Sequence, residues 1–310
     1  MLNVMSHSST RAELHNLQES EDGDGAPLEA VSPATSTRAR IETLDRDGLS
    51  YFGRGTNGRG VLLVHGVTGS PVEMKYIAKH LHRAGYTVYA PLLAGHGVDM
   101  ATLRRSRWED WYQSLAENCN WFKGEVDQVV MAGVCVGGLL GLRLAHHDPA
   151  IKAATIYSPL LEYDGWNAPR HYRYGFISVP IAVHLGFSRF ISLKERPPFG
   201  IKSDRIRRLL AETPDGIRGT LPAFPVDTLH QNLRLFAEME RLLPKIKTPT
   251  LLVHATEDDL GSPNNALHIQ KKLAGPCEIE WLHNSYHMVH VDQEHRIASE
   301  RTRTFFDAAA

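Results

Sequence analysis

Two kinds of apolar segment alternate along the chain, and this alternation strongly limits the folds that it can adopt. Short β-rich runs, such as Gly60–His65, are followed by longer segments with apolar residues at helical spacing, such as Pro71–Gly85. Strands that alternate with helices in this way form a mostly parallel sheet, covered by helices on both faces. The sequence therefore predicts an α/β fold.

Further elements and the domain organisation follow from the same pattern. We expect strands at residues 86–90, 128–132, 152–158, 250–254 and 277–282, and helices at 108–122, 138–146, 264–273 and from 292 onward. The alternation stops where aromatic, proline-rich and arginine-rich sequence appears, so we expect a core of residues 45–160 and 236–310 with a lid insertion at 161–235. Residues 1–44 are polar and lack periodicity, which predicts a disordered tail.

A glycine-rich turn, Gly133-Val-Cys-Val-Gly-Gly138, joins an apolar strand to an apolar helix. It matches the G-x-S-x-G nucleophile elbow, with cysteine in place of serine. The flanking glycines allow a strained backbone at Cys135, because a Cβ on either neighbour would clash with the adjacent strands or the helix. The turn also places Cys135 near the N-terminus of the following helix, whose partial positive charge favours a thiolate. Buried cysteines and glycine-rich nucleotide loops are the alternatives, but the Lys-Ser/Thr of a phosphate loop does not follow here.

Acid and base partners for this nucleophile follow in the order expected of such a turn. Asp258 comes just after one predicted strand and His287 just after the next, at the strand ends where open α/β sheets build their sites. We expect Asp258 to orient the imidazole of His287, which takes up the thiol proton. Glu257 and Asp259 are weaker candidates for the acid.

Two backbone N–H groups are expected to stabilise the oxyanion that forms during acyl transfer. The segment His65-Gly-Val-Thr-Gly69 follows the first strong strand, so the N–H of Val67 and that of Val136 are the candidates. We expect His65 to brace this loop by hydrogen bonding. No Glu motif or cysteine pair completes a metal site around His287 and His290, so neither a metal nor an organic cofactor is expected.

From about residue 45 onward, the chain resembles the α/β-hydrolase family, specifically its monoacylglycerol-lipase and bacterial carboxylesterase branch. The resemblance rests on Val64-His-Gly-Val-Thr-Gly-Ser-Pro71, Pro91-Leu-Leu-Ala-Gly-His-Gly97, Trp108-Glu-Asp-Trp111, the elbow, and the Asp258 and His287 segments in that order. It implies ester hydrolysis through an acyl-enzyme, with Cys135, Asp258 and His287 as the catalytic triad and Val67 and Val136 as oxyanion donors. The Gly-x-Cys-x-Gly-Gly box is similar to that of dienelactone hydrolases and polyhydroxyalkanoate synthases.

The sulfur leaves several functions open. A free cysteine ionises near pH 8.5, roughly, so it forms an acyl-enzyme readily and exchanges well with thioesters. The interpretation is an esterase-, lipase- or thioesterase-like hydrolase with a Cys-His-Asp triad. The alternative is an acyltransferase that moves an acyl group from coenzyme A (CoA) or a carrier protein to an alcohol or amine, with water excluded by the lid. A non-catalytic ligand-binding protein with the hydrolase fold is the hypothesis from another class.

The lid supplies candidate substrate contacts. Tyr172 and Phe176 belong to an aromatic and apolar stretch that can line an acyl pocket, although the lid's own core gives the same pattern. Arg205 and Arg208 lie in an arginine-rich segment that suits the phosphate of CoA or a carrier-protein arm. An ordinary solvated helix face is the more common explanation of such a segment.

Composition excludes several partners and locations. With 34 Lys and Arg against 35 Asp and Glu, the formal net charge is −1, and no global basic field exists to hold nucleic acid. The most apolar run, residues 129–142, is shorter than the ~20 residues of a membrane span, and the first thirty residues contain no signal-peptide core. The 3 widely spaced cysteines argue against a disulfide framework. We therefore expect a cytoplasmic protein that acts on a small-molecule acyl ester or thioester.

Overall fold

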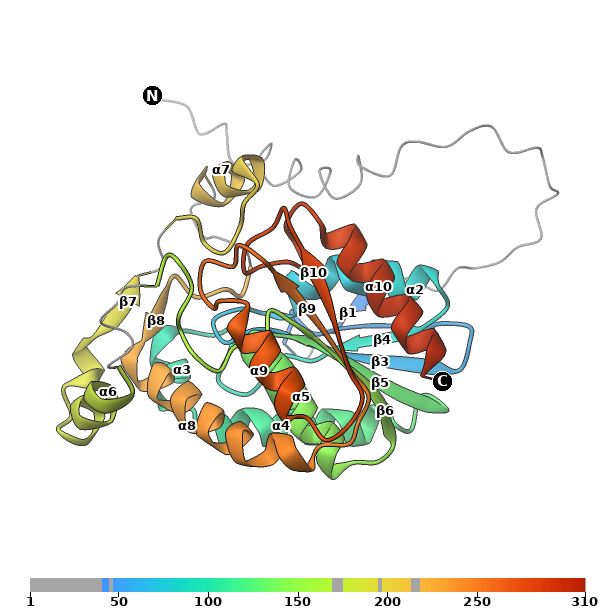
Figure 1. The fold of residues 1–310 in the computed structure, drawn as a ribbon, viewed down its shortest axis with the longest axis horizontal. Helices are drawn as coiled ribbons and strands as arrows, with labels where there is room; N and C mark the ends of the chain where they lie inside the picture. Colours follow the sequence, from blue (N-terminus) through green and yellow to red (C-terminus); the bar gives the residue numbers. More distant parts are fainter. Residues whose placement is uncertain (1–40, 45–46, 169–174, 195–196, 213–217, 310) are drawn as a thin grey trace, which may run out of the picture. The chain divides into compact units, whose positions relative to one another are not determined.

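An eight-stranded sheet forms the centre of the computed structural model, which describes residues 41–44, 47–168, 175–194, 197–212 and 218–309 (Figure 1). In spatial order the strands are β1 (Glu42–Thr43), β2 (Tyr51–Gly53), β4 (Thr87–Ala90), β3 (Arg59–Val64), β5 (Gln128–Val134), β6 (Ile151–Tyr157), β9 (Thr250–Ala255) and β10 (Cys277–Leu282). Only the β1–β2 and β2–β4 pairs of this sheet are antiparallel. The predicted mostly parallel α/β sheet is confirmed.

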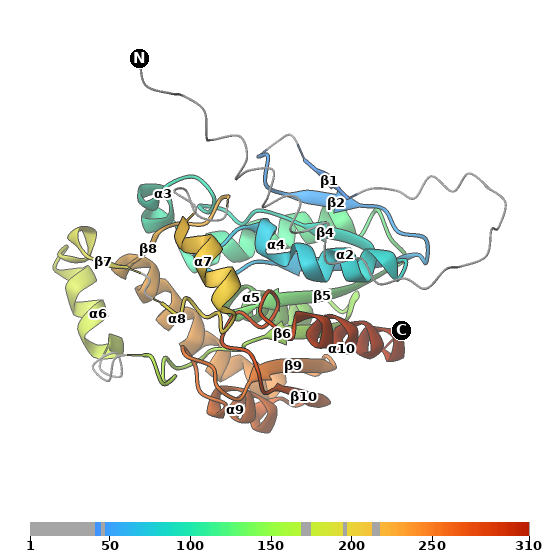
Figure 2. The same ribbon diagram turned by 90° about the horizontal axis from the view of Figure 1, so that it is seen from above.

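Helices cover both faces of the sheet (Figures 1 and 2). On one face lie α2 (Lys75–Arg83), which continues the short 3-10 helix η2 (Pro71–Met74), and α10 (His295–Ala308); on the other lie α4 (Trp108–Phe122), α5 (Cys135–His147), α8 (Val226–Leu242) and α9 (Asn264–Lys272). Strands β3, β5 and β9 are buried along almost their whole length. Because both of their faces are covered, these strands are continuous apolar runs rather than alternating ones.

The segment between β6 and β9 contains the lid elements. These are α6 (Gly175–His184), η4 (Ser188–Phe190), β7 (Ser192–Lys194), α7 (Asp204–Glu212) and β8 (Ala223–Pro225), and they gather beyond one end of the sheet together with the start of α8 (Figure 2). β7 pairs with β8 in a small antiparallel sheet. A separate apolar cluster of Val179, Val226 and Leu229 joins α6 to the first turns of α8.

Helix α8 belongs to the lid and to the core at once. Its first half packs against α6, whereas Leu235 and Met239 in its second half are fully buried in the main core. The predicted lid boundary at residue 235 therefore falls inside this helix. At the other end, residues 1–40 of the predicted tail lie outside the described part of the chain, and the sheet begins at Glu42.

The short elements complete the description. Helix α3 (Met100–Arg105) precedes α4, and η5 (Leu243–Lys245) follows α8. The predicted helix at residues 108–122 and strand at 277–282 have the bounds observed for α4 and β10. Among the helices of the described residues, none has the length and apolar character needed to cross a bilayer.

Candidate active site

Cys135 lies at a turn that contains no loop residue, because β5 ends at Val134 and α5 begins at Cys135 itself. Its φ angle is +50°, in the left-handed region that residues other than glycine rarely adopt. Such a conformation costs about 1–3 kcal/mol and persists only where the surrounding structure enforces it. The elbow predicted at Gly133–Gly138 thus has the strained geometry expected of a nucleophile position.

Two glycines make this tight turn sterically accessible. A Cβ on Gly137 would lie 2.1 Å from the carbonyl oxygen of His65, and a Cβ on Gly133 would lie 2.8 Å from backbone atoms of Gly137 and Gly138. These neighbours are backbone atoms, so they cannot move aside as a flexible side chain would. The glycine pattern therefore allows α5 to approach the end of β3 closely enough to place Cys135 beside the His65 loop.

The imidazole of His287 contacts the carboxylate of Asp258. The ring Nδ1 lies 2.9 Å from Oδ2 and 3.1 Å from Oδ1, and both residues are buried. Asp258 Oδ1 also accepts the backbone N–H groups of Leu260, at 2.8 Å, and Gly261, at 2.9 Å. These donors fix the carboxylate, which in turn fixes the orientation of the ring.

Charges within this cluster shift both ionisation equilibria. Burial disfavours a charge on His287, but the Asp258 carboxylate and the Cys135 side chain outweigh it and raise the pKa of the imidazole well above its usual range. Burial would raise the pKa of Asp258, but the charge and hydrogen bonding of His287 lower it below its ordinary value. An ionised acid and a protonated ring are therefore favoured together.

The structure brings Cys135, His287 and Asp258 into one cluster. Because Nδ1 of the ring faces the carboxylate, Nε2 remains for the thiol, and a side-chain hydrogen bond with Cys135 contributes to the raised pKa of His287. Of the three consecutive acidic residues at 257–259, Asp258 contacts the imidazole ring. Glu257 instead pairs with Lys202 at 2.8 Å, and Asp259 accepts the backbone N–H of His287 at 3.3 Å.

Hydrogen bonds hold the loop that carries Val67. Nδ1 of His65 donates to the carbonyl of Gly66 at 2.8 Å, and its Nε2 accepts the N–H of Leu93 at 3.1 Å. Burial lowers the pKa of His65 to about 3, so the ring stays neutral and serves the bracing role predicted for it. Val136 occupies the first turn of α5, where backbone N–H groups have no acceptor within the helix.

Two supporting residues were missed by the sequence reasoning. Glu73, buried in η2, accepts the N–H of Gly66 and so holds the loop that carries Val67. Ser158 directly follows β6 at a φ of +47°, and its hydroxyl donates to the carbonyl of His287. An acid within the apolar segment 71–85 and a serine at a strand end were the available signals, but neither is specific without the spatial contacts.

Some of the residues predicted to bind substrate in the lid lie outside the described part of the chain. Tyr172 lies outside the described residues, and Phe176 lies in α6 with its side chain also outside the described part. Arg205 and Arg208 are exposed on α7. Their roles in substrate binding stay predictions.

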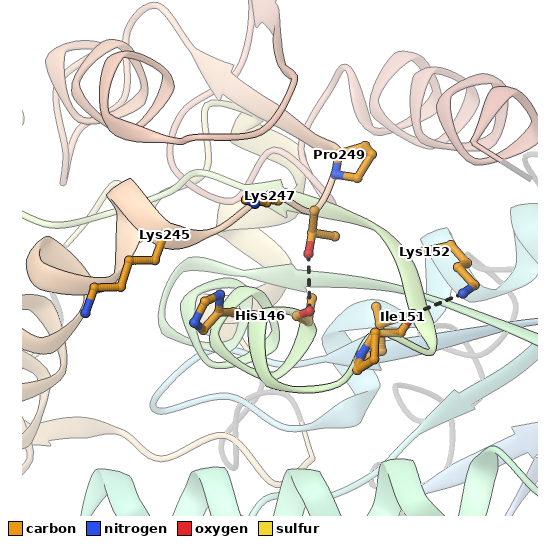
Figure 3. Close-up of a pocket in the computed structure, with 9 residues that line it drawn as sticks. His146, Ile151, Lys152, Lys245, Lys247 and Pro249 are labelled. Carbon is orange, nitrogen blue, oxygen red and sulfur yellow. Dashed lines mark hydrogen bonds between the residues drawn. The ribbon is translucent and has the colours of Figure 1, made fainter.

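A surface hollow lies away from this cluster, where α5 ends and β6 and β9 begin (Figure 3). It is lined by Ala145, His146, Pro149, Ile151, Lys152, Lys245, Lys247, Thr248 and Pro249. Cys135, Asp258 and His287 instead follow the carboxyl ends of their strands, so this hollow is not part of the candidate site. Within the described ranges, no group of three or more His, Cys, Asp or Glu side chains is arranged to hold a metal ion.

The sheet topology, the strained elbow and the acid–imidazole pair together define an α/β-hydrolase. Residues 56–294 match the family model Hydrolase_4, described as serine aminopeptidase S33, and the chain belongs to this family. The family is named for serine, whereas this chain carries cysteine at the elbow.

Similar proteins include two from Bacillus. The chain is 29% identical over 248 residues to a thermostable monoacylglycerol lipase from Bacillus sp. (strain H-257), and the aligned region covers 80% of this chain and 90% of the lipase. It is 24% identical over 254 residues to a carboxylesterase from Bacillus subtilis (strain 168), and the aligned region covers 80% of this chain and 92% of the carboxylesterase. A solved structure from work on the metagenome-derived lipolytic enzymes LipS and LipT matches with a TM-score of 0.69 and 26% identity, covering 85% of this chain and 98% of that one.

The three cysteines are expected to differ in reactivity toward iodoacetamide at pH 7. All are free; burial raises the pKa of Cys119 to about 11 and that of Cys277 to about 12, whereas Cys135 has the His287 imidazole beside it. Each unit by which a pKa is raised lowers the thiolate fraction about tenfold, so Cys119 and Cys277 should react slowly and the label should concentrate on Cys135. Peptide mass spectrometry measures this, with urea-unfolded protein as the control in which all three react. Equal labelling in the folded protein would contradict the assignment.

Proposed function

We propose that this chain is a carboxylic ester hydrolase that forms an acyl-enzyme on Cys135. The observation that carries the proposal is the thiol at the strained elbow together with the buried His287–Asp258 pair. The names of the similar proteins, a monoacylglycerol lipase and a carboxylesterase, support esters as the substrate class. Plain hydrolysis is favoured over acyl transfer on the same ground.

The chemistry proceeds in two steps. The thiolate of Cys135 attacks the ester carbonyl, the carbon–oxygen bond to the alcohol breaks, and His287 gives its proton to the leaving alkoxide. Water then loses a proton to His287 and attacks the thioester, so that the carbon–sulfur bond breaks and the carboxylic acid leaves. The N–H groups of Val67 and Val136 stabilise the oxyanion of each tetrahedral intermediate. Asp258 holds the ring in position and stabilises its protonated form.

The thiol must stay reduced for this cycle to continue. A cysteine at a reactive site is readily oxidised or trapped as a disulfide in an oxidising compartment. Since the cysteines are free, we place the protein in a reducing compartment, the cytoplasm.

Intact mass spectrometry after brief exposure to p-nitrophenyl esters of increasing chain length tests the proposal. The expected result is a single acyl adduct that maps to Cys135 and decays as free acid appears. The anilide of the same acid serves as a comparison, because the family description names an aminopeptidase; we expect the ester to react faster. An adduct on Cys119 or Cys277 would overturn the mechanism, and acyl groups recovered on added glycerol rather than water would favour the acyltransferase.

A further inference from the structure

The inward face of α8 changes from apolar to polar as it reaches the lid. Leu235 and Met239 lie in the main core, and on the two preceding turns Asn232 and Thr228 are fully buried. Residues four apart share one face of a helix, so these two polar side chains lie one above the other. Neither Oδ1 of Asn232 nor Oγ1 of Thr228 has a hydrogen-bond partner among the described residues.

Buried polar side chains are normally paired, because losing water without gaining a partner is unfavourable. Asn232 is half paired: its Nδ2 donates to the hydroxyl oxygen of Tyr163 at 2.9 Å. Exchanging the amide oxygen and nitrogen would still leave one polar atom of this side chain without a partner. Two such residues on adjacent turns therefore point to a ligand group that completes their hydrogen bonds.

Tyr163 connects this polar pair to the main core, to which the nucleophile belongs. Its ring packs against the main core, which includes Cys135, and against the lid cluster of Val179, Val226 and Leu229. Burial first, and then the charge on Cys135, raise the pKa of its hydroxyl, so the group stays protonated. Since this oxygen already accepts from Asn232, its own hydrogen remains available for donation.

We propose that Thr228, Asn232 and Tyr163 form a subsite for a hydroxyl group of the ester substrate. A hydroxyl both donates and accepts, so it can donate to Oδ1 of Asn232 while it accepts from Tyr163 or Thr228. The side chains packed beside Tyr163 are apolar, because Phe236 lies against it with ring centroids 5.7 Å apart and Leu229 belongs to the apolar cluster that it contacts. An unsubstituted alkyl group there would leave the polar atoms unpaired. This inference rests on the proposed ester hydrolysis and specifies which esters are preferred.

The hydroxyl can come from either part of the ester, and three esters distinguish the sources. Ethyl butanoate is the reference, ethyl 3-hydroxybutanoate carries the hydroxyl on the acyl chain, and 2-hydroxyethyl butanoate carries it on the alcohol. We expect one hydroxylated ester to exceed the reference in kcat/KM by about 10- to 100-fold, the range for one or two buried hydrogen bonds. Asn232→Leu and Thr228→Val should each bring this ratio toward one.

The ratio between esters is insensitive to a general loss of activity, so partial misfolding does not imitate the expected result. Leu235→Met, on the same helix face, is the matched control and should keep the wild-type ratio, because it conserves side-chain volume. Equal rates for all three esters would overturn the subsite and leave the hydrolase intact. If no ester is turned over, binding of the three esters to Cys135→Ala still decides: a hydroxyl preference removed by Asn232→Leu supports the subsite, and equal affinities overturn it.

Discussion

Replacing Cys135 by alanine should lower kcat/KM for ester hydrolysis by about 10⁴- to 10⁶-fold, the range seen when a covalent nucleophile is removed. Alanine lacks an atom that can attack the carbonyl, so no acyl-enzyme forms. The residual rate would come from the oxyanion donors and from substrate positioning. Initial rates with a p-nitrophenyl ester, together with the loss of the acyl adduct in intact mass spectra, measure the effect.

Two further variants separate chemistry from packing at this position. Cys135→Ser restores a nucleophilic atom at the same strained turn, so it should recover part of the activity that alanine loses. Cys119→Ala is the matched control, because Cys119 is fully buried in α4, away from the predicted triad, and its loss should change kcat by no more than a few-fold. If Cys135→Ala retained a tenth of the wild-type activity, a covalent role for the thiol would be wrong.

The helices and strands were predictable because their buried faces require apolar residues at regular spacing in the sequence. The helix at residues 108–122 has a buried stripe, including Trp111, Leu115 and Phe122, at helical spacing. The strands predicted at 250–254 and 277–282, observed as β9 and β10, were recognised from short apolar runs bounded by turn residues. Their order also placed Asp258 and His287 at adjacent strand ends, since β9 and β10 are parallel neighbours.

Other features depend on contacts between residues that are distant in sequence. Glu73 and Ser158 look ordinary until the fold places them against Gly66 and His287. The predicted lid boundary falls inside α8, a helix that continues without interruption while its partner changes from α6 to the main core. Asn232 and Thr228 likewise look like ordinary polar residues in the sequence, and only the packing shows that they are buried.

Asp258→Asn should lower kcat/KM by about 10³- to 10⁴-fold while leaving the fold in place. In the wild type, Oδ1 of Asp258 accepts the N–H groups of Leu260 and Gly261 at 2.8 and 2.9 Å. An asparagine would keep its carbonyl oxygen at that position, so its NH₂ group would face Nδ1 of His287. The ring proton would then move to Nε2, and the nitrogen that faces the thiol could no longer accept a proton.

The same variant should also change the pH dependence of kcat/KM. The Asp258 carboxylate helps to raise the pKa of His287, so removing its charge lowers that pKa, and the imidazolium loses its proton at a lower pH. Because the imidazolium protonates the leaving alkoxide, the decline of activity on the alkaline side should begin at a lower pH than in the wild type. Glu257→Gln is the control, since Glu257 pairs with Lys202 at the surface, and it should leave the profile unchanged. An unshifted alkaline limb in Asp258→Asn, or an equal loss in Asp259→Asn, would assign the orienting acid elsewhere.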